Sequence, residues 1–265
     1  MTEPQGLCQI AKLNADDDGF LSALDALTAW GEVKNSSIEK VVVEILGDVR
    51  MKGDKALVEY TNRFDRRECL NADELCITSE ALKQALGSID IEARLALEQA
   101  AQRIKDYHAH QLQQSWQYKE QNGTMLGQQI TPLERVGIYV PGGKASYPSS
   151  VLMNAIPARV AGVKEITASA PPQGGEPHPA IVAAMHMGGA DKILCLGGIQ
   201  AVAAMAIGTE TISGVDMLVG PGNMFVAEAK RQLFGRVGID LFAGPTETLV
   251  IADETSDPEI CAIDL

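Results

Sequence analysis

Short apolar runs alternate with longer helical patterns in the second half of the chain. We expect strands at four apolar runs that are each closed by Gly or Pro: 136–140, 165–170, 192–196 and 215–219. Helical patterns fill the segments that follow each of these runs: 151–163, 178–187, 200–207 and 223–233. Strands that alternate with helices are typical of βαβ units around a parallel sheet. The pattern therefore predicts an α/β fold with a doubly wound, Rossmann-like sheet.

The first 130 residues read mainly as helices. Apolar positions with helical spacing and capping Ser or Thr residues predict four helices: from Ser36 or Ser37 to Val49, Lys55–Phe64, from Thr78 or Ser79 onward, and Ile91–Tyr118. Asn122-Gly123 lies between two short runs and predicts a tight hairpin turn.

The two halves differ in their content of helix-breaking residues. Every proline except Pro4, and most of the glycines, lie beyond residue 130. Such a shift indicates two structural units. We expect an N-terminal arm at 1–35 and a Rossmann-like domain at 136–246, inserted into a helix-rich α/β domain. That second domain comprises 36–135 and 247–265, is incomplete in this chain, and is extended by a strand from Thr248 to Ala252.

Composition and charge narrow the class of protein. The 265 residues are 46% hydrophobic and carry a formal net charge of −13, which argues against nucleic acid or an anionic membrane as the main partner. No apolar run reaches the ~18 residues of a membrane span, and the acidic N-terminus does not read as a signal peptide. The five scattered cysteines predict reduced thiols. We therefore expect a cytoplasmic globular protein.

Glycine-rich turns follow three of the predicted strands. These are Gly142-Gly143, Gly197-Gly198 and Gly220-Pro-Gly222, each before a predicted helix. Parallel strands place such turns at one edge of the sheet, where ligands of open α/β sheets bind. Glycines and helix N-termini also suit phosphate groups. The turns predict a crevice for an anionic or nucleotide-like ligand, although the G-x-G-x-x-G and P-loop motifs are absent.

Polar side chains lie beside these turns. Tyr139 lies near the end of its strand, Gln200 and Asn223 begin helices, and Thr246 follows Gly244-Pro245. Helix capping and turn stabilisation explain Asn223 and Thr246 by themselves, whereas capping and ligand binding both stay open for Gln200.

Candidates for metal ligation and nucleophilic catalysis are lacking. His108 and His110 point to different helix faces, and the Cys, His and Asp residues show no metal-ligand spacing. The sequence also lacks a G-x-S-x-G motif and a Cys–His arrangement.

Four long segments, in order, resemble motifs of histidinol dehydrogenases: Glu134–Lys144, Leu196–Glu210, Val219–Arg231 and Ile239–Glu247. The first half is similar to the N-terminal region of that family, including Asn62-Arg-Phe-Asp65. The resemblance implies an NAD-dependent, zinc-requiring oxidation of L-histidinol through L-histidinal to L-histidine, the last steps of histidine biosynthesis, by an intertwined homodimer. By motif, it implies that Tyr139, Gln200 and Asn223 contact NAD and that Thr246 contacts the substrate.

The resemblance also implies that this chain lacks part of the catalytic machinery. Family members continue beyond the position of Leu265 into segments that hold the zinc ligands and the Glu-His acid/base pair. The stretch from Asp257 reads as a helix start with Pro258 at its first position. We therefore expect a truncated, catalytically incomplete chain of low stability or altered association. Two alternatives stay open: a dehydrogenase of another small polar alcohol, and a non-catalytic NAD-binding fragment.

Overall fold

The structure is a computed structural model that describes residues 12–28, 36–142, 146–173, 178–242 and 249–264. Its contacts divide the chain into two compact units, Met1–Ser37 and Ile38–Leu265. Within the first unit, residues Phe20–Thr28 form helix α1. The candidate site lies in the second unit.

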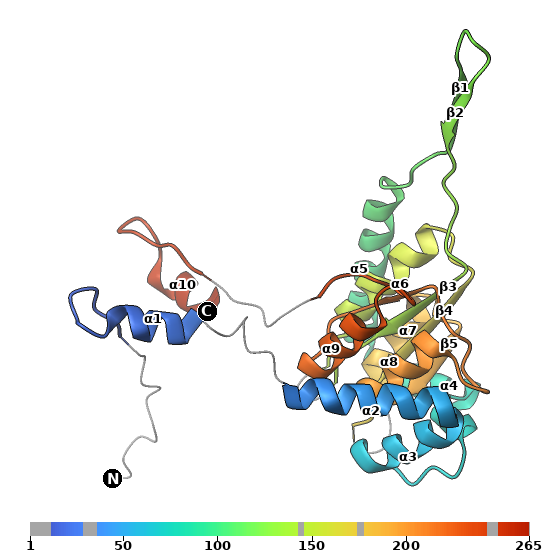
Figure 1. The fold of residues 1–265 in the computed structure, drawn as a ribbon, viewed down its shortest axis with the longest axis horizontal. Coiled ribbons are helices and arrows are strands. Elements are labelled where there is room, and N and C mark those ends of the chain that lie inside the picture. The colour runs from blue at the N-terminus through green and yellow to red at the C-terminus, as the bar shows by residue number, and fades with distance from the viewer. Residues whose placement is uncertain (1–11, 29–35, 143–145, 174–177, 243–248, 265) are drawn as a thin grey trace. The chain divides into compact units, whose positions relative to one another are not determined.

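A five-stranded parallel sheet forms the centre of the second unit (Figure 1). Its strands are β3 (Arg135–Tyr139), β4 (Glu165–Ala170), β5 (Lys192–Cys195), β6 (Met217–Val219) and β7 (Gly238–Ile239). They are joined by helices α6 (Pro148–Val160), α7 (Pro179–Met187), α8 (Gly198–Ile207) and α9 (Met224–Leu233). The spatial order is β5-β4-β3-β6-β7, with every pair parallel. This order is that of a Rossmann-like sheet, so the predicted fold class is confirmed.

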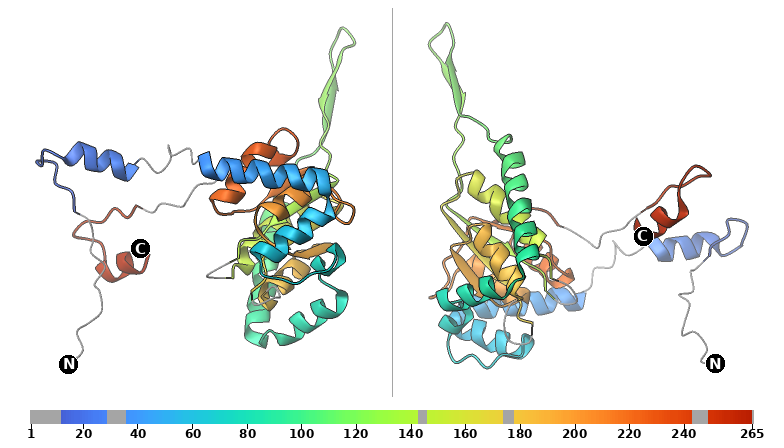
Figure 2. Two further views of the ribbon diagram at one scale, coloured as in Figure 1. Left: turned by 60° about the horizontal axis from the view of Figure 1, so that its bottom comes forward. Right: turned by 180° about the vertical axis from the view of Figure 1, so that it is seen from behind.

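Helices from the first half of the chain cover both faces of this sheet, as the two views of Figure 2 show. Helices α2 (Ser36–Lys52) and α3 (Asp54–Phe64) share one apolar cluster with α8 and α9. Helices α4 (Ser79–Ser88) and α5 (Ile91–Ala109) pack on the other face, against α6 and α7. The sheet is therefore sandwiched between two helical layers, each built from both halves of the sequence.

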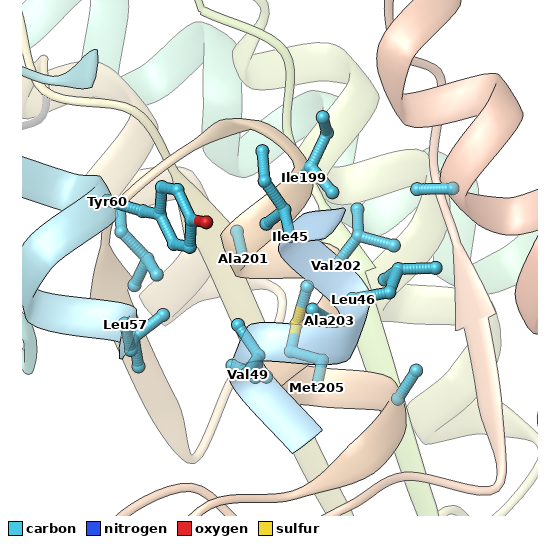
Figure 3. Packing of buried hydrophobic residues seen from close by; sticks show 14 of the residues in the cluster. Ile45, Leu46, Val49, Leu57, Tyr60, Ile199, Ala201, Val202, Ala203 and Met205 are labelled. Carbon is cyan, nitrogen blue, oxygen red and sulfur yellow. The ribbon is translucent and has the colours of Figure 1, made fainter. Parts of the chain in front are cut away.

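Small side chains on α8 allow α3 to pack closely on it, and α2 contributes to the same buried cluster (Figure 3). Ile45 of α2 and Leu57 of α3 are fully buried in the same cluster as Ala201, Ala203 and Met205 of α8. Full burial of one such aliphatic side chain stabilises a fold by roughly 1.5–3 kcal/mol. The helix that carries Gln200 is thus held in place from its outer side.

The predicted helices of the first half are found, with one correction. Thr78 caps α4, since its Oγ1 accepts a hydrogen bond from the Ala81 N–H. The helix predicted to extend from Ile91 to Tyr118 ends at Ala109, and that prediction is wrong beyond this point. Residues Trp116–Lys119 instead form strand β1. Alternating aromatic side chains such as Trp116 and Tyr118 favour a strand over a helix.

Strand β1 pairs antiparallel with β2 (Met125–Gln128) around the predicted Asn122-Gly123 turn. All eight paired residues are exposed, and the ribbon is visible in both views of Figure 2. The rings of Trp116 and Tyr118 stack with their centroids 6.2 Å apart. The hairpin prediction is therefore confirmed.

The remaining elements are short. Residues Ala72–Leu75 form the 3-10 helix η2, and α10 spans Pro258–Asp264, beginning at the predicted Pro258. The strand predicted from Thr248 to Ala252 is not found. Thr248 lies outside the described residues, and 249–252 have no regular structure. A strand needs a hydrogen-bonded neighbour, and Leu249 and Ile251 are 84% and 89% exposed.

The domain boundaries at 35, 136 and 246 stay predictions. The helices in the described ranges are all too short or too polar to cross a bilayer.

Candidate functional site

The carboxyl ends of β3 and β6 meet at the point where the strand order reverses. Ligands of open α/β sheets bind at such a point. Gly220 follows β6 and has φ +110°, and a Cβ on it would lie 2.1 Å from the carbonyl oxygen of Tyr139. Only glycine allows this close approach, which explains the glycine that the sequence places here.

A buried ion pair holds the Gly220 turn in place. Lys230 of α9 is 3% exposed, and its Nζ donates to the carbonyl oxygen of Gly220 and, at 2.7 Å, to Oδ1 of Asp240. Asp240 Oδ2 accepts a hydrogen bond from the Gly220 N–H at 2.8 Å. The two side chains thus satisfy both backbone groups of Gly220. Sequence reasoning assigned neither residue a role, because their pairing depends on how α9 returns to the sheet.

Tyr139 reaches from the end of β3 to the start of α8. Its ring is buried, with 5% of the residue exposed, and its Oη accepts a hydrogen bond from the Gly198 N–H at 3.2 Å. Burial raises the pKa of this phenol, and the nearby Asp65 carboxylate raises it further. The hydroxyl therefore stays protonated at neutral pH and keeps its proton for donation.

Gln200 lies on α8 with its side chain buried and 1% of the residue exposed. Its Nε2 donates to Oδ2 of Asp65 at 3.4 Å, and the same oxygen accepts from the Gly197 N–H at 3.0 Å. Its Oε1 has no hydrogen-bond partner among the described residues. A Cβ on Gly198 would lie 2.8 Å from that oxygen, so Oε1 faces the glycine turn.

Asp65 is a site residue that sequence reasoning missed. It follows α3, in a loop closed by two reciprocal 2.8 Å hydrogen bonds between Asn62 and the backbone of Cys69. Arg67 fixes the loop to the sheet by donating to the carbonyl oxygen of Cys195 at 2.7 Å. The signal was present in the Asn62–Asp65 motif, but its partners lie on distant segments such as Gly197.

The carboxyl group of Asp65 is partly desolvated. Burial raises its pKa above the ordinary value, and three groups oppose the shift: the Gly197 N–H, the Arg67 guanidinium and the Gln200 amide. The site thus contains a half-buried carboxylate, a buried phenol and a buried amide around one glycine turn.

Asn223 acts as a helix cap. Its Oδ1 accepts hydrogen bonds from the N–H groups of Phe225 and Val226 at 3.0 and 3.1 Å. The structure therefore shows the capping role that the local pattern favoured, and it leaves the Asn223 Nδ2 group available to donate. Thr246 lies outside the described residues. Tyr139 and Gln200 are the two predicted residues that the structure brings together, around Gly198.

Other regions hold fewer chemical groups. A groove of about 580 Å³ lies between α6, the segments 111–113 and 130–133, and strands β3 and β6 of the sheet. Tyr139, Gln200 and Asn223 are not among the residues that line it. Within the described ranges, no group of three His, Cys, Asp or Glu side chains is placed to hold a metal ion. The residues that the structure describes do not fit a zinc site.

Comparisons with known proteins agree on one family. The family model described as "Histidinol dehydrogenase" matches residues 29–265. Histidinol dehydrogenase from Hydrogenovibrio crunogenus is 52% identical over 98% of this chain and 60% of its own length. That of Neisseria meningitidis serogroup A is 52% identical over 96% of this chain and 59% of its own length.

A solved structure supports the same relationship. The crystal structure of histidinol dehydrogenase from Elizabethkingia anophelis superposes with a TM-score of 0.80 at 36% identity, and the match covers 90% of this chain and 56% of that one. This chain therefore spans about 60% of the length of the curated relatives it matches.

Proposed function

Because this chain belongs to the histidinol dehydrogenase family, we propose that it supplies the NAD-binding part of an enzyme that oxidises L-histidinol through L-histidinal to L-histidine. The observation that carries this proposal is the unpartnered, buried Oε1 of Gln200, which faces Gly198, the residue whose N–H donates to the Tyr139 hydroxyl. A buried acceptor without a partner is rare in folded proteins, and a ligand donor would satisfy it.

The residues present fit a dinucleotide. Gln200 offers an acceptor, Tyr139 a hydroxyl proton and Asn223 an amide donor, all at the carboxyl edge of the sheet. Such groups bind ribose hydroxyls and carboxamides. When bound, NAD accepts the hydride that leaves the alcohol carbon. The chain's own residues orient the cofactor, and the buried cluster that α8 shares with α2 and α3 keeps that surface rigid.

The proposal also covers the contact with the substrate and the requirement for zinc that the family implies. Thr246 is proposed to contact the substrate, as the family motif implies. The described residues do not fit zinc. We expect NAD binding from these 265 residues without histidinol oxidation. The family also supports a homodimer and a cytoplasmic location, which sedimentation and cell fractionation would test.

Calorimetric titration of NAD into the chain tests the cofactor assignment. We expect saturable binding that Gln200→Ala weakens about tenfold, the effect of losing one buried hydrogen bond. Tyr139→Phe should weaken it similarly. Gln117→Ala, on the exposed hairpin, is the matched control and should bind NAD as the parent chain does. Folded protein that gives no saturable NAD binding, or binding unaffected by either variant, contradicts the proposal.

A separate measurement tests the reaction. NADH absorbance is followed after L-histidinol is added with and without zinc. Sustained NADH formation by this chain contradicts the expectation that it lacks the catalytic groups. NAD binding without turnover supports that expectation.

A further inference from the structure

The Asp65 carboxylate dictates how the Gln200 amide is turned. An ionised carboxylate only accepts hydrogen bonds, so the amide presents its NH₂ group to Asp65. The distance from Nε2 to Asp65 Oδ2 is 3.4 Å. With the opposite orientation, two acceptor oxygens would face each other. Asp65 thereby leaves Gln200 Oε1 turned toward Gly198, as an acceptor that nothing described satisfies.

Asp65 also occupies the position at which helices bind anions. The first N–H groups of a helix are the usual donors to a phosphate. At the start of α8, the Gly197 N–H is bonded to Asp65 and the Gly198 N–H to the Tyr139 hydroxyl. A phosphate at this turn would compete with a carboxylate fixed by the protein itself. The negative charges of the phosphate and of the Asp65 carboxylate would repel each other strongly, because the site is partly buried.

We propose that Asp65 is a positioning residue that keeps the Gln200 carbonyl oxygen turned toward Gly198 and excludes phosphate from the start of α8. This corner of the site then binds an uncharged donor of the dinucleotide, a ribose hydroxyl or a carboxamide N–H, and the diphosphate lies elsewhere. The inference rests on the proposed function in so far as NAD is the ligand.

The surroundings of Asp65 are consistent with this role. Arg67 is the cationic side chain that faces it, and Tyr139 is the other titratable group beside it. Arg67 itself is held by two carbonyl oxygens, those of Cys195 and Glu74, at 2.7 and 3.1 Å. The carboxylate is therefore fixed by a loop that is tied directly to the carboxyl end of β5.

Asp65→Ala tests the amide orientation. It removes Oδ2, the oxygen to which both the Gly197 N–H and Gln200 Nε2 donate, so nothing fixes which end of the Gln200 amide faces the turn. We expect the Kd for NAD to rise about tenfold. Glu68→Ala removes the same charge three residues away, at an exposed side chain, and should leave the Kd unchanged. A folded Asp65→Ala chain that binds NAD like the parent chain overturns the proposal.

A double-mutant cycle tests whether the two side chains act as one unit. Gln200→Ala removes the oriented acceptor itself. We expect Asp65→Ala/Gln200→Ala to bind NAD no more weakly than Gln200→Ala alone, because Asp65 acts on the ligand through Gln200. Additive losses in the folded double variant contradict a shared hydrogen-bond unit.

Amide NMR tests the role of Asp65 without NAD. In the parent chain, the Gly197 backbone amide and the Gln200 side-chain amide should shift together with the titration of one carboxyl group, and this shift should vanish in Asp65→Asn. Added pyrophosphate should perturb the Gly197 and Gly198 amides in Asp65→Asn only. Equal perturbation in the parent chain overturns the proposal. If the parent chain does not bind NAD, the proposed function fails, while these spectra still decide the role of Asp65.

Discussion

The Glu210 carboxylate caps helix α3 from 156 residues away in the sequence, since its Oε2 accepts a 2.8 Å hydrogen bond from the Asp54 N–H. The contact is reciprocal, because the Asp54 carboxylate accepts a 2.5 Å hydrogen bond from the hydroxyl of Thr211. Gly53 has no Cβ, which lets Glu210 approach. The loop after α8 is thereby attached to the turn between α2 and α3.

Removal of this distant cap should loosen the helical layer that covers α8. Glu210→Ala leaves the Asp54 N–H at the start of α3 without its acceptor, and we expect a loss of about 1 kcal/mol in the free energy of unfolding. Urea denaturation followed by circular dichroism measures this loss. Glu68→Gln controls for the removal of one negative charge and should fall within ~0.5 kcal/mol of the parent chain. A Glu210→Ala chain as stable as that control would show that the contact carries no stability.

Substitution of Asp240 in the Lys230–Asp240 ion pair should cost more stability than substitution of Lys230. Asp240→Asn leaves the ammonium of a residue that is 3% exposed facing only the Gly220 carbonyl oxygen and a neutral amide. We expect a loss of about 3 kcal/mol, the usual effect of an uncompensated buried charge. Lys230→Met removes that charge and should cost less, because Asp240 keeps its bond to the Gly220 N–H. Chemical denaturation of the two variants compares them, and the reverse ranking would contradict this account.

Alanine substitutions at two glycines of similar backbone conformation distinguish the cost of backbone strain from the cost of a steric clash. Gly220 and Gly235 have φ values of +110° and +93°, but a Cβ meets the Tyr139 oxygen at 2.1 Å in the first case and open space in the second. Gly235→Ala should cost about 1–2 kcal/mol, from backbone strain alone. Gly220→Ala should cost clearly more and also weaken NAD binding, since its turn must move. Equal losses in thermal unfolding would mean that the turn adjusts freely.

We expect ionisation of the buried Tyr60 to lower the stability of the protein at high pH. Burial and the 2.8 Å hydrogen bond to Asp48 raise its pKa to about 12, above the ordinary 10.0. A raised pKa means that the stability is fully present below about pH 10 and is lost as the pH rises toward 12. The free energy of unfolding should therefore fall more steeply across this window in the parent chain than in Tyr60→Phe. Parallel pH profiles for the two proteins would refute the assignment.

The parallel sheet was predictable because each of its longer strands has a recognisable local sequence pattern. Strands β3 to β6 are apolar runs closed by Gly or Pro, and each was placed within about two residues. Strand β7 was missed because Gly238–Ile239 is too short to show alternation. Helix α5 was predicted too long because residues 110–115 contain no Gly or Pro to mark its end.

The site was predictable only in part, because its hydrogen bonds join distant segments. The positions of Tyr139 and Gln200 follow from strand ends and helix starts. Asp65 lies 135 residues before Gln200, and no local pattern reveals that they meet. For Asn223 the sequence indicated the cap that the structure shows, and its predicted contact with NAD stays a prediction, as does the role of Thr246.

The position of Trp116 on the exposed hairpin has a spectroscopic consequence. The chain contains two tryptophans, at positions 30 and 116, so the sheet and the helices on its faces contain none. Trp116 is 54% exposed and already in contact with Tyr118. The wavelength of its fluorescence maximum therefore depends on what covers the hairpin and changes little with the surroundings of the sheet. In a Trp30→Phe chain, where Trp116 is the remaining tryptophan, a blue shift on raising protein concentration would record self-association through that hairpin.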